Sequence, residues 1–303
     1  QRYPESIALH LNPTQPGKPV RQQDLFDYQT ALETSGYYAQ AVVSIEPDPA
    51  LAAAVPIRVE VVERPEKLFS VGAGYSTDTG VRVQTAWQHR DILDQGLRLK
   101  LEALLETKEG AGLAELSWPR NAKGYEYSVG LQLKQEDIEG QETRSASLGA
   151  KRSRTRGQIE TTLSLQYQIE EQTIGDVLDE RNEALALNYA WTQRTVGRAI
   201  YPRRGYVLTL QGSCAAEALF SETSFIRLYA RHTHHFRAGD NGRLVLRGEL
   251  GGVLAETREG IPTDYLFRAG GDNSVRGYAF ESLGRTLEGG VASVRYLATG
   301  SVE

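Results

Sequence analysis

The stretch LFRAGGDNSVRGYAFESLG, residues 266–284, lies between two segments that are expected to be β-strands. A loop of this length inside a β-protein is usually either functional or disordered. Glycine allows a backbone to turn tightly or to approach another surface closely, so Gly270, Gly271 and Gly277 favour an ordered, functional loop. The polar side chains that could dock this loop onto a polar wall are Arg268, Asp272, Asn273, Arg276 and Tyr278.

The composition excludes several classes of protein. Of the 303 residues, 40% are hydrophobic and 24% are charged, which is typical neither of a disordered chain nor of a helical membrane protein. No apolar run reaches the length of about 18 residues that a transmembrane helix needs, whereas the strands of a β-barrel alternate and need no such run. The net charge of −5 gives no support for nucleic-acid binding, and the single cysteine, Cys214, excludes an internal disulfide.

From residue 68 onward, apolar and polar residues alternate in segment after segment. Clear examples are residues 97–105, 126–134, 162–169, 184–191 and 243–250. About eleven or twelve such segments are joined by loops that are alternately short and long. In a soluble sandwich the apolar face would pack on a second sheet. Here the pattern persists with aromatic residues near the segment ends, which favours an antiparallel transmembrane β-barrel with a polar lumen over residues 66–303.

Residues 1–65 have a different pattern and predict a small α+β domain. An extended piece at 6–11 is followed by a helix over 20–38, with Asp24 as its N-cap, and by strands at 41–45 and 57–62. The chain contains no methionine and does not begin with a signal pattern, so we expect it to start inside a longer gene product. The last predicted strand, 289–303, has no following turn, and we expect further strands after it.

The loop sequence FRAGGDNSVRGY, residues 267–278, resembles the signature loop of the outer-membrane protein assembly superfamily, which includes BamA, TamA and the two-partner secretion transporters. The core of that signature is the tetrad Val275, Arg276, Gly277 and Tyr278. Residues 70–80, 201–206 and 299–303 resemble the TamA branch in particular. The sequence SGYY at 35–38, the two following strands and the junction at 63–65 look like the last POTRA repeat, a periplasmic domain next to the barrel.

The resemblance implies a barrel of sixteen strands, about twelve of them present here, with the signature loop folded into the lumen. It implies that Arg276 pairs with acidic side chains of the inner wall, and Glu303 is a candidate partner. The planar guanidinium of arginine suits a carboxylate, and a buried pair of this kind is costly to break. Gly277 would let the backbone bend at the wall, and Tyr278 would anchor the loop.

The resemblance also implies a function without catalysis or cofactors. In this superfamily the first and last barrel strands meet at a weak seam that opens laterally. Client outer-membrane proteins and autotransporters would then pair their strands with the exposed edge. The predicted first strand, 68–75, contains Gly72 and Gly74 and ends on Tyr75, and glycine weakens strand pairing. The chain would lie in the bacterial outer membrane, with the POTRA domain in the periplasm in contact with the partner TamB.

Other interpretations of the sequence remain open. His232, His234 and His235 could bind a metal ion, or they could be ordinary residues near a strand end, since no acidic or sulfur ligand lies at a telling spacing. A second function within the superfamily is a secretion pore for one dedicated exoprotein. A third is a barrel enzyme, which is disfavoured because the long loops at 136–142, 170–183 and 215–223 contain no histidine.

Overall fold

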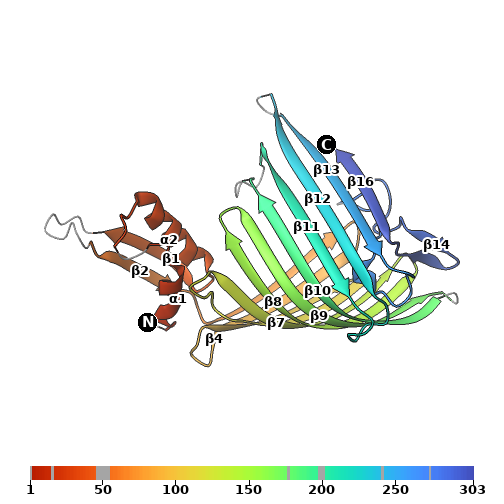
Figure 1. Cartoon of the computed structure of the whole chain (residues 1–303), viewed down its shortest axis with the longest axis horizontal. Coiled ribbons are helices and arrows are strands. Elements are labelled where there is room, and N and C mark those ends of the chain that lie inside the picture. Colours follow the sequence, from red (N-terminus) through yellow and green to blue (C-terminus); the bar gives the residue numbers. More distant parts are fainter. Residues whose placement is uncertain are drawn as a thin grey trace.

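The structure is a computed structural model in which two units can be distinguished, a small α/β unit and a large antiparallel sheet (Figure 1). The residues that it describes are 2–14, 17–45, 55–175, 178–196, 202–239, 242–272 and 274–303. No helix among these residues is long and apolar enough to cross a membrane.

The N-terminal unit contains two helices and a two-stranded antiparallel sheet. Its elements are α1 (Glu5–Leu11), α2 (Gln22–Thr34), β1 (Tyr38–Ile45) and β2 (Ile57–Glu63). Both strands were predicted within a few residues of their observed ends. The core that joins helices and sheet is rich in tyrosine and consists of Tyr3, Ile7, Tyr28, Leu32, Tyr37, Tyr38 and Ala41.

Three details of this unit differ from the predictions. The helix predicted over 20–38 ends at Thr34, and Tyr38 is already part of β1. The segment 6–11 is helical rather than extended, because Ile7 and Leu11, four residues apart, fall on one helical face and both pack against the tyrosine core. Asp24 is not the N-cap of α2. The helix begins at Gln22, and the Asp24 carboxylate accepts a hydrogen bond from the Arg21 backbone N–H at 3.0 Å, so Arg21 occupies the cap position.

The large sheet has twelve strands among the described residues, which agrees with the predicted eleven or twelve. They are β3 (Lys67–Ser76), β4 (Gly80–Ile92), β5 (Leu97–Glu106), β6 (Glu109–Ser117), β7 (Tyr125–Ile138), β8 (Gln141–Arg156), β9 (Ile159–Ile174), β10 (Leu178–Arg194), β11 (Gly205–Ala215), β12 (Phe225–Ala238), β13 (Gly242–Leu254) and β16 (Tyr296–Val302). Each strand pairs with its neighbours in sequence, except that β13 pairs with β16 across a long connection.

That connection contains a short 3₁₀ helix, η2 (Thr263–Tyr265), and a separate hairpin of β14 (Arg285–Leu287) and β15 (Gly290–Ala292). The prediction of one continuous strand over 289–303 was therefore wrong. The first part of that segment pairs with β14, whereas the second part leaves the hairpin and pairs with β13.

The register of the sheet gives it two chemically different faces. Leu148 of β8, Leu165 of β9 and Leu187 of β10 lie on the same side of the sheet, and all three side chains are about half exposed. We call their side the outer face. The opposite, inner face carries Gln168 and Glu170, which hydrogen-bond to the long connection after β13. Figure 1 shows the sheet curling around this inner side.

The N-terminal unit is in contact with one end of the sheet, which we call the proximal end (Figure 1). The hydroxyl group of Tyr37 donates a hydrogen bond to the Gly96 carbonyl at 2.5 Å, between β4 and β5. The guanidinium of Arg98 donates to the Ser35 carbonyl at 3.2 Å and also lies over the Tyr37 ring. The two units are therefore held together by hydrogen bonds as well as by the chain itself.

Candidate functional site

The candidate site is the loop that follows β13 and lies on the inner face, residues 261–284 with the exception of residue 273; we call it the docked loop. Its first part is fixed by a buried apolar cluster. The cluster consists of Ala184, Ala186, Phe225, Val253, Ile261, Tyr265, Leu266 and Phe267. These residues come from β10, β12, β13 and the loop, so burial of apolar surface anchors the loop to the sheet.

Polar groups of β9 anchor the same part of the loop. The Glu170 carboxylate is 1% exposed and accepts hydrogen bonds from the Thr263 hydroxyl, at 2.6 Å, and from the Thr263 backbone N–H. Asn182 of β10 donates a further bond to it. Next to it, the Gln168 amide donates to the Asp264 carboxylate at 3.0 Å. A buried carboxylate that accepts several hydrogen bonds fixes its partners firmly, so these contacts define the start of the docked loop.

Arg268 is the buried arginine of this site. Its side chain is 5% exposed, and its guanidinium lies 2.5 Å from the Glu281 carboxylate and donates to the Ile138 carbonyl of β7 at 3.2 Å. Burial raises the pKa of Glu281, and the nearby Arg268 counteracts that rise. The ion pair joins the first and last parts of the docked loop, and the bond from Arg268 attaches them to β7. The sequence marked Arg268 only as one of several polar residues, because nothing in the spacing links it to Glu281.

Phe267 provides an apolar contact between the docked loop and the sheet, next to the ion pair of Arg268. Its ring stacks on Tyr229 of β12 at a centroid distance of 6.1 Å, and the Arg227 guanidinium lies 4.8 Å from its centroid. Gly251 of β13 leaves the space that the ring fills, since a Cβ atom there would be 2.5 Å from Phe267. This is a close approach that only glycine allows.

The glycine-rich part of the loop forms its tip. Gly270 and Gly271 have φ angles of +119° and +90°, which side-chain-bearing residues rarely adopt, as the sequence predicted for a tightly turning segment. The Thr77 hydroxyl donates to the Asp272 carboxylate at 3.3 Å. Thr77 lies in the turn between β3 and β4. The docked loop therefore extends from β13, where it begins, to β3 at the opposite edge of the sheet.

Arg276 lies beyond this tip, and its Nη2 atom is 3.3 Å from Oε1 of Glu303. The structure thus brings these two predicted residues together. The expected burial of Arg276 was wrong, however, because its side chain is 61% exposed, whereas Arg268 is the buried cation. Arg247 of β13 also approaches the Glu303 carboxylate, at 3.8 Å. Of the rest of the tetrad, Val275 is half-buried, whereas Gly277, with a φ of +90°, and Tyr278 are exposed.

The predicted seam strand corresponds to β3. Among the described residues it pairs with β4 only, so its other edge is open there. Gly72 faces the Gln84 side chain, where an added Cβ would be 3.0 Å from the amide nitrogen, whereas Gly74 has open space around it. Tyr75 is on the outer face and is 75% exposed.

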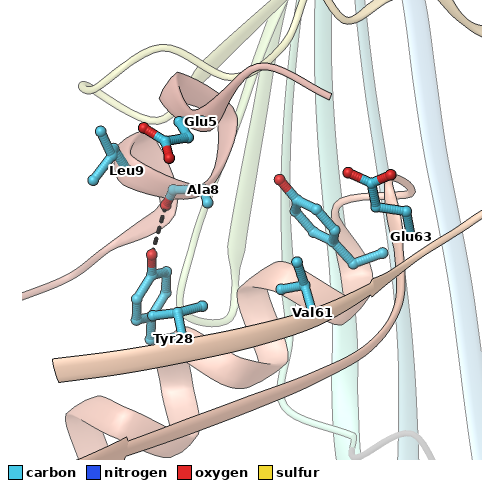
Figure 2. Close-up of a pocket in the computed structure, with 8 residues that line it drawn as sticks. Glu5, Ala8, Leu9, Tyr28, Val61 and Glu63 are labelled. Atoms are coloured by element: carbon cyan, nitrogen blue, oxygen red, sulfur yellow. Dashed lines mark hydrogen bonds between the residues drawn. The ribbon is translucent and has the colours of Figure 1, made fainter. Parts of the chain in front are cut away.

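A second concave surface lies in the N-terminal unit, between α1, α2 and β2 (Figure 2). This groove has a volume of about 570 Å³. In Figure 2, Leu9 and Val61 border it on opposite sides, and the Tyr28 hydroxyl donates to the Ala8 carbonyl at 2.9 Å. Among the described residues, β2 pairs only with β1, so the groove lies beside an open strand edge.

The three histidines lie on β12 but not on one face. His232 and His234 are on the outer face, where their rings contact Tyr206 and Phe236, and His235 is on the opposite face. In the part of the chain that the structure describes, no group of three or more His, Cys, Asp or Glu side chains is placed to hold a metal ion. Residues 201 and 273, which belong to two motifs quoted above, lie outside the described residues.

Comparison with known proteins gives a family and a fold. The sequence model of the Omp85 superfamily domain matches residues 67–303. The structure is similar to that of BamA from Haemophilus ducreyi lacking POTRA domains 1–3, with a TM-score of 0.73 and 15% identity over 99% of this chain and 64% of that chain. It is also similar to CdiB from Acinetobacter baumannii (TM-score 0.52, 17% identity, 90% of this chain and 54% of that chain). CdiB from Escherichia coli gives a TM-score of 0.58 at 13% identity, over 99% of this chain and 58% of that chain.

These identities establish a likeness of fold alone. The chain spans less than two thirds of the length of each of these three structures.

Proposed function

This chain belongs to the Omp85 superfamily, and from that premise we propose that it is part of an assembly factor that inserts client β-barrel proteins and autotransporters into the bacterial outer membrane, without catalytic chemistry or a cofactor. The observation that carries the proposal is the contact of the docked loop with the turn after β3. An open strand edge is a template for another strand. The Asp272–Thr77 bond connects the loop to the turn that directly follows β3, the strand that presents such an edge.

The mechanism we propose is strand addition at a seam that begins at β3. Gly72 and Gly74 lower the cost of separating β3 from a partner, because glycine packs poorly in a strand and loses more conformational entropy on pairing. Arg268, which is paired with Glu281, fixes the docked loop to β7, while the tip of the loop contacts the β3–β4 turn. The loop would thus link the inner wall to the seam and hold β3 in place while a client strand pairs.

For the N-terminal unit we propose a POTRA domain that lies in the periplasm and presents the open edge of β2 to an extended segment. The groove beside that edge combines apolar side chains, such as Leu9 and Val61, with the carboxylates of Glu5 and Glu63 (Figure 2). The sequence resemblance favours the TamA branch, with TamB as the periplasmic partner.

A second candidate function is a two-partner secretion pore for one exoprotein. The likeness of fold to the two CdiB structures favours it. A pore that must pass a chain through the lumen requires the docked loop to leave it, whereas lateral insertion does not. Two measurements distinguish the two functions, each made on the full-length protein before and after the loop is cross-linked to β7. They are single-channel conductance and client assembly. Unchanged client assembly with the loop cross-linked supports lateral insertion.

The proposal is tested by Arg276→Glu in the full-length protein in its own cell, with Arg285→Glu on β14 as a control of equal charge change at an exposed site. We expect Arg276→Glu to leave a folded, heat-modifiable barrel that no longer displays an autotransporter client at the cell surface. A barrel that fails to accumulate would assign Arg276 a structural role. Normal display of the client would contradict its assigned role in assembly.

A further inference from the structure

The outer face of the sheet is apolar along most of its width, but it carries three arginines at the proximal end of β8. They are Arg152, Arg154 and Arg156, which alternate with residues of the inner face. Arg152 lies opposite Tyr127 and Leu163, and Arg154 lies opposite Tyr125 and Thr161. Arg152 and Arg156 are exposed and Arg154 is half-buried. We call these three residues, together with Tyr125, the arginine patch.

The described residues of the chain do not neutralise the charge of the patch. Among the described residues, no carboxylate lies within ion-pair distance of any of the three guanidinium groups. Instead, two of them converge on one ring: the Arg152 and Arg154 Cζ atoms are 4.8 Å and 4.9 Å from the centroid of Tyr125. The neighbouring inner-face residue, Lys151, is paired with Glu115. An unpaired cationic patch in a chain of net charge −5 indicates an anionic ligand from outside the chain.

The surroundings of the patch specify the source of that anion. Toward the middle of β8 the same face continues with Leu148 and Ala150, which the sheet register places beside apolar residues of β7 and β9. Tyr125, Tyr127 and Trp118 are at the same proximal level, as aromatic residues are at the boundary of a bilayer. Arginine is costly near the centre of a bilayer but nearly free of cost at its boundary. The guanidinium fork matches two phosphate oxygens.

We propose that the arginine patch binds the phosphate headgroups of anionic phospholipids in the leaflet that faces the N-terminal unit, with their acyl chains along the leucines of β7 to β9. The inference rests on the proposed membrane location of the sheet. Tyr125 holds the two guanidinium groups in place by cation–π contact, so that less conformational entropy is lost when the headgroup binds. The patch would fix the depth and tilt of the sheet at β8, a strand between the two edges of the sheet.

The test is native mass spectrometry of the full-length protein in micelles that contain phosphatidylglycerol or phosphatidylcholine. We expect the wild type to retain phosphatidylglycerol in preference. Each arginine should contribute about fivefold in affinity, and the triple variant R152Q/R154Q/R156Q should lose that preference. The control is R144Q, on the same strand and face at the opposite end, where Arg144 is already paired with Glu142 at 2.7 Å. It should retain the lipid as the wild type does.

Several results would overturn the proposal. They are an absence of preference in the wild type, full retention in the triple variant, an equal loss in R144Q, or displacement of the lipid by inorganic phosphate at the same concentration. Binding of a soluble poly-glutamate peptide without any lipid preference would point to an acidic protein partner instead. Heat-modifiable mobility shows that each variant is folded, and R156Q replaces the triple variant should that one not fold. Because no client protein enters this assay, its outcome is independent of the proposed assembly function.

Discussion

At the scale of single residues, the site depends on which arginine is buried. Arg268 is shielded from solvent and joined to Glu281, whereas Arg276 of the signature tetrad is exposed and meets Glu303 near the end of the chain. A buried charge that loses its partner retains its desolvation cost, whereas an exposed pair contributes little because water screens it. The stability of the docked loop and the proposed action of the tetrad are therefore assigned to different residues.

We expect Arg268→Gln to destabilise the docked loop by about 3–5 kcal/mol, because it leaves the Glu281 carboxylate without its ion-pair partner. Arg276→Gln should cost less than about 1 kcal/mol. The measurement is limited proteolysis of the loop in folded, detergent-solubilised protein across a urea series. The double variant Arg268→Gln/Glu281→Gln is the control and should recover part of the loss. A larger effect of Arg276→Gln than of Arg268→Gln would contradict this assignment.

At the scale of elements, β3 and the N-terminal unit differ from the rest of the molecule. β3 carries two inward-facing glycines, of which only Gly74 has open space around it. The N-terminal unit has a core in which tyrosines predominate, and these side chains are buried as neutral hydroxyls. The strand pairing of β3 and the proton binding of the N-terminal unit can therefore each be changed without altering the docked loop.

Gly74→Val tests the importance of a weak β3. Valine has a higher strand propensity by up to about 1 kcal/mol, and at this position its side chain meets no neighbour. We expect a barrel of unchanged or higher thermal stability that assembles clients more slowly. Gly72→Val serves as the comparison, since it must displace Gln84 and should lower stability. Faster or unchanged client assembly in Gly74→Val would contradict the proposal that β3 forms the seam.

The N-terminal unit should open at alkaline pH. Burial raises the pKa of Tyr38 to about 12 and raises the pKa values of Tyr3, Tyr28 and Tyr37 as well. In the unfolded chain these hydroxyls titrate near pH 10, so the stability is fully present below about pH 10. It falls as the pH rises through about 12, because the unfolded state releases protons first. Tyrosinate absorbance and near-ultraviolet circular dichroism should change together. Ionisation without loss of the dichroism would contradict the argument.

At the scale of the whole molecule, the twelve strands of the described residues give the sheet a polar face on its curved inner side and a largely apolar outer face. Inner-face groups such as Gln168 and Glu170 find partners in the docked loop. Outer-face leucines such as Leu165 and Leu187 stay half exposed in the isolated chain. Contact with lipid would stabilise such an outer face, which is the physical basis for the proposed location in a membrane.

Two neighbouring substitutions on β9 test this arrangement. Leu165→Arg places a charge on the outer face near the middle of the strand, where it should destabilise the membrane-inserted fold by about 2–4 kcal/mol. Ser164→Arg places the same charge on the inner face, beside a polar cavity of about 350 Å³, and should be tolerated. The measurement is the folded fraction after refolding into lipid vesicles, followed by heat-modifiable mobility. Equal folded fractions for the two variants would contradict the assignment of the faces.

The sequence by itself determined most strands of the large sheet and their two faces, the small N-terminal unit and the position of the glycine-rich loop. These follow from short-range properties, because a period of two residues fixes which face a side chain occupies and glycine marks where the backbone turns. The tertiary structure decided the rest. The helical form of residues 6–11 depends on the tyrosine core. The pairing of Arg268 with Glu281, the bond between Thr77 and Asp272 and the break between β15 and β16 depend on segments that are distant in sequence. Burial is a property of the folded chain, so no local pattern could tell Arg268 from Arg276.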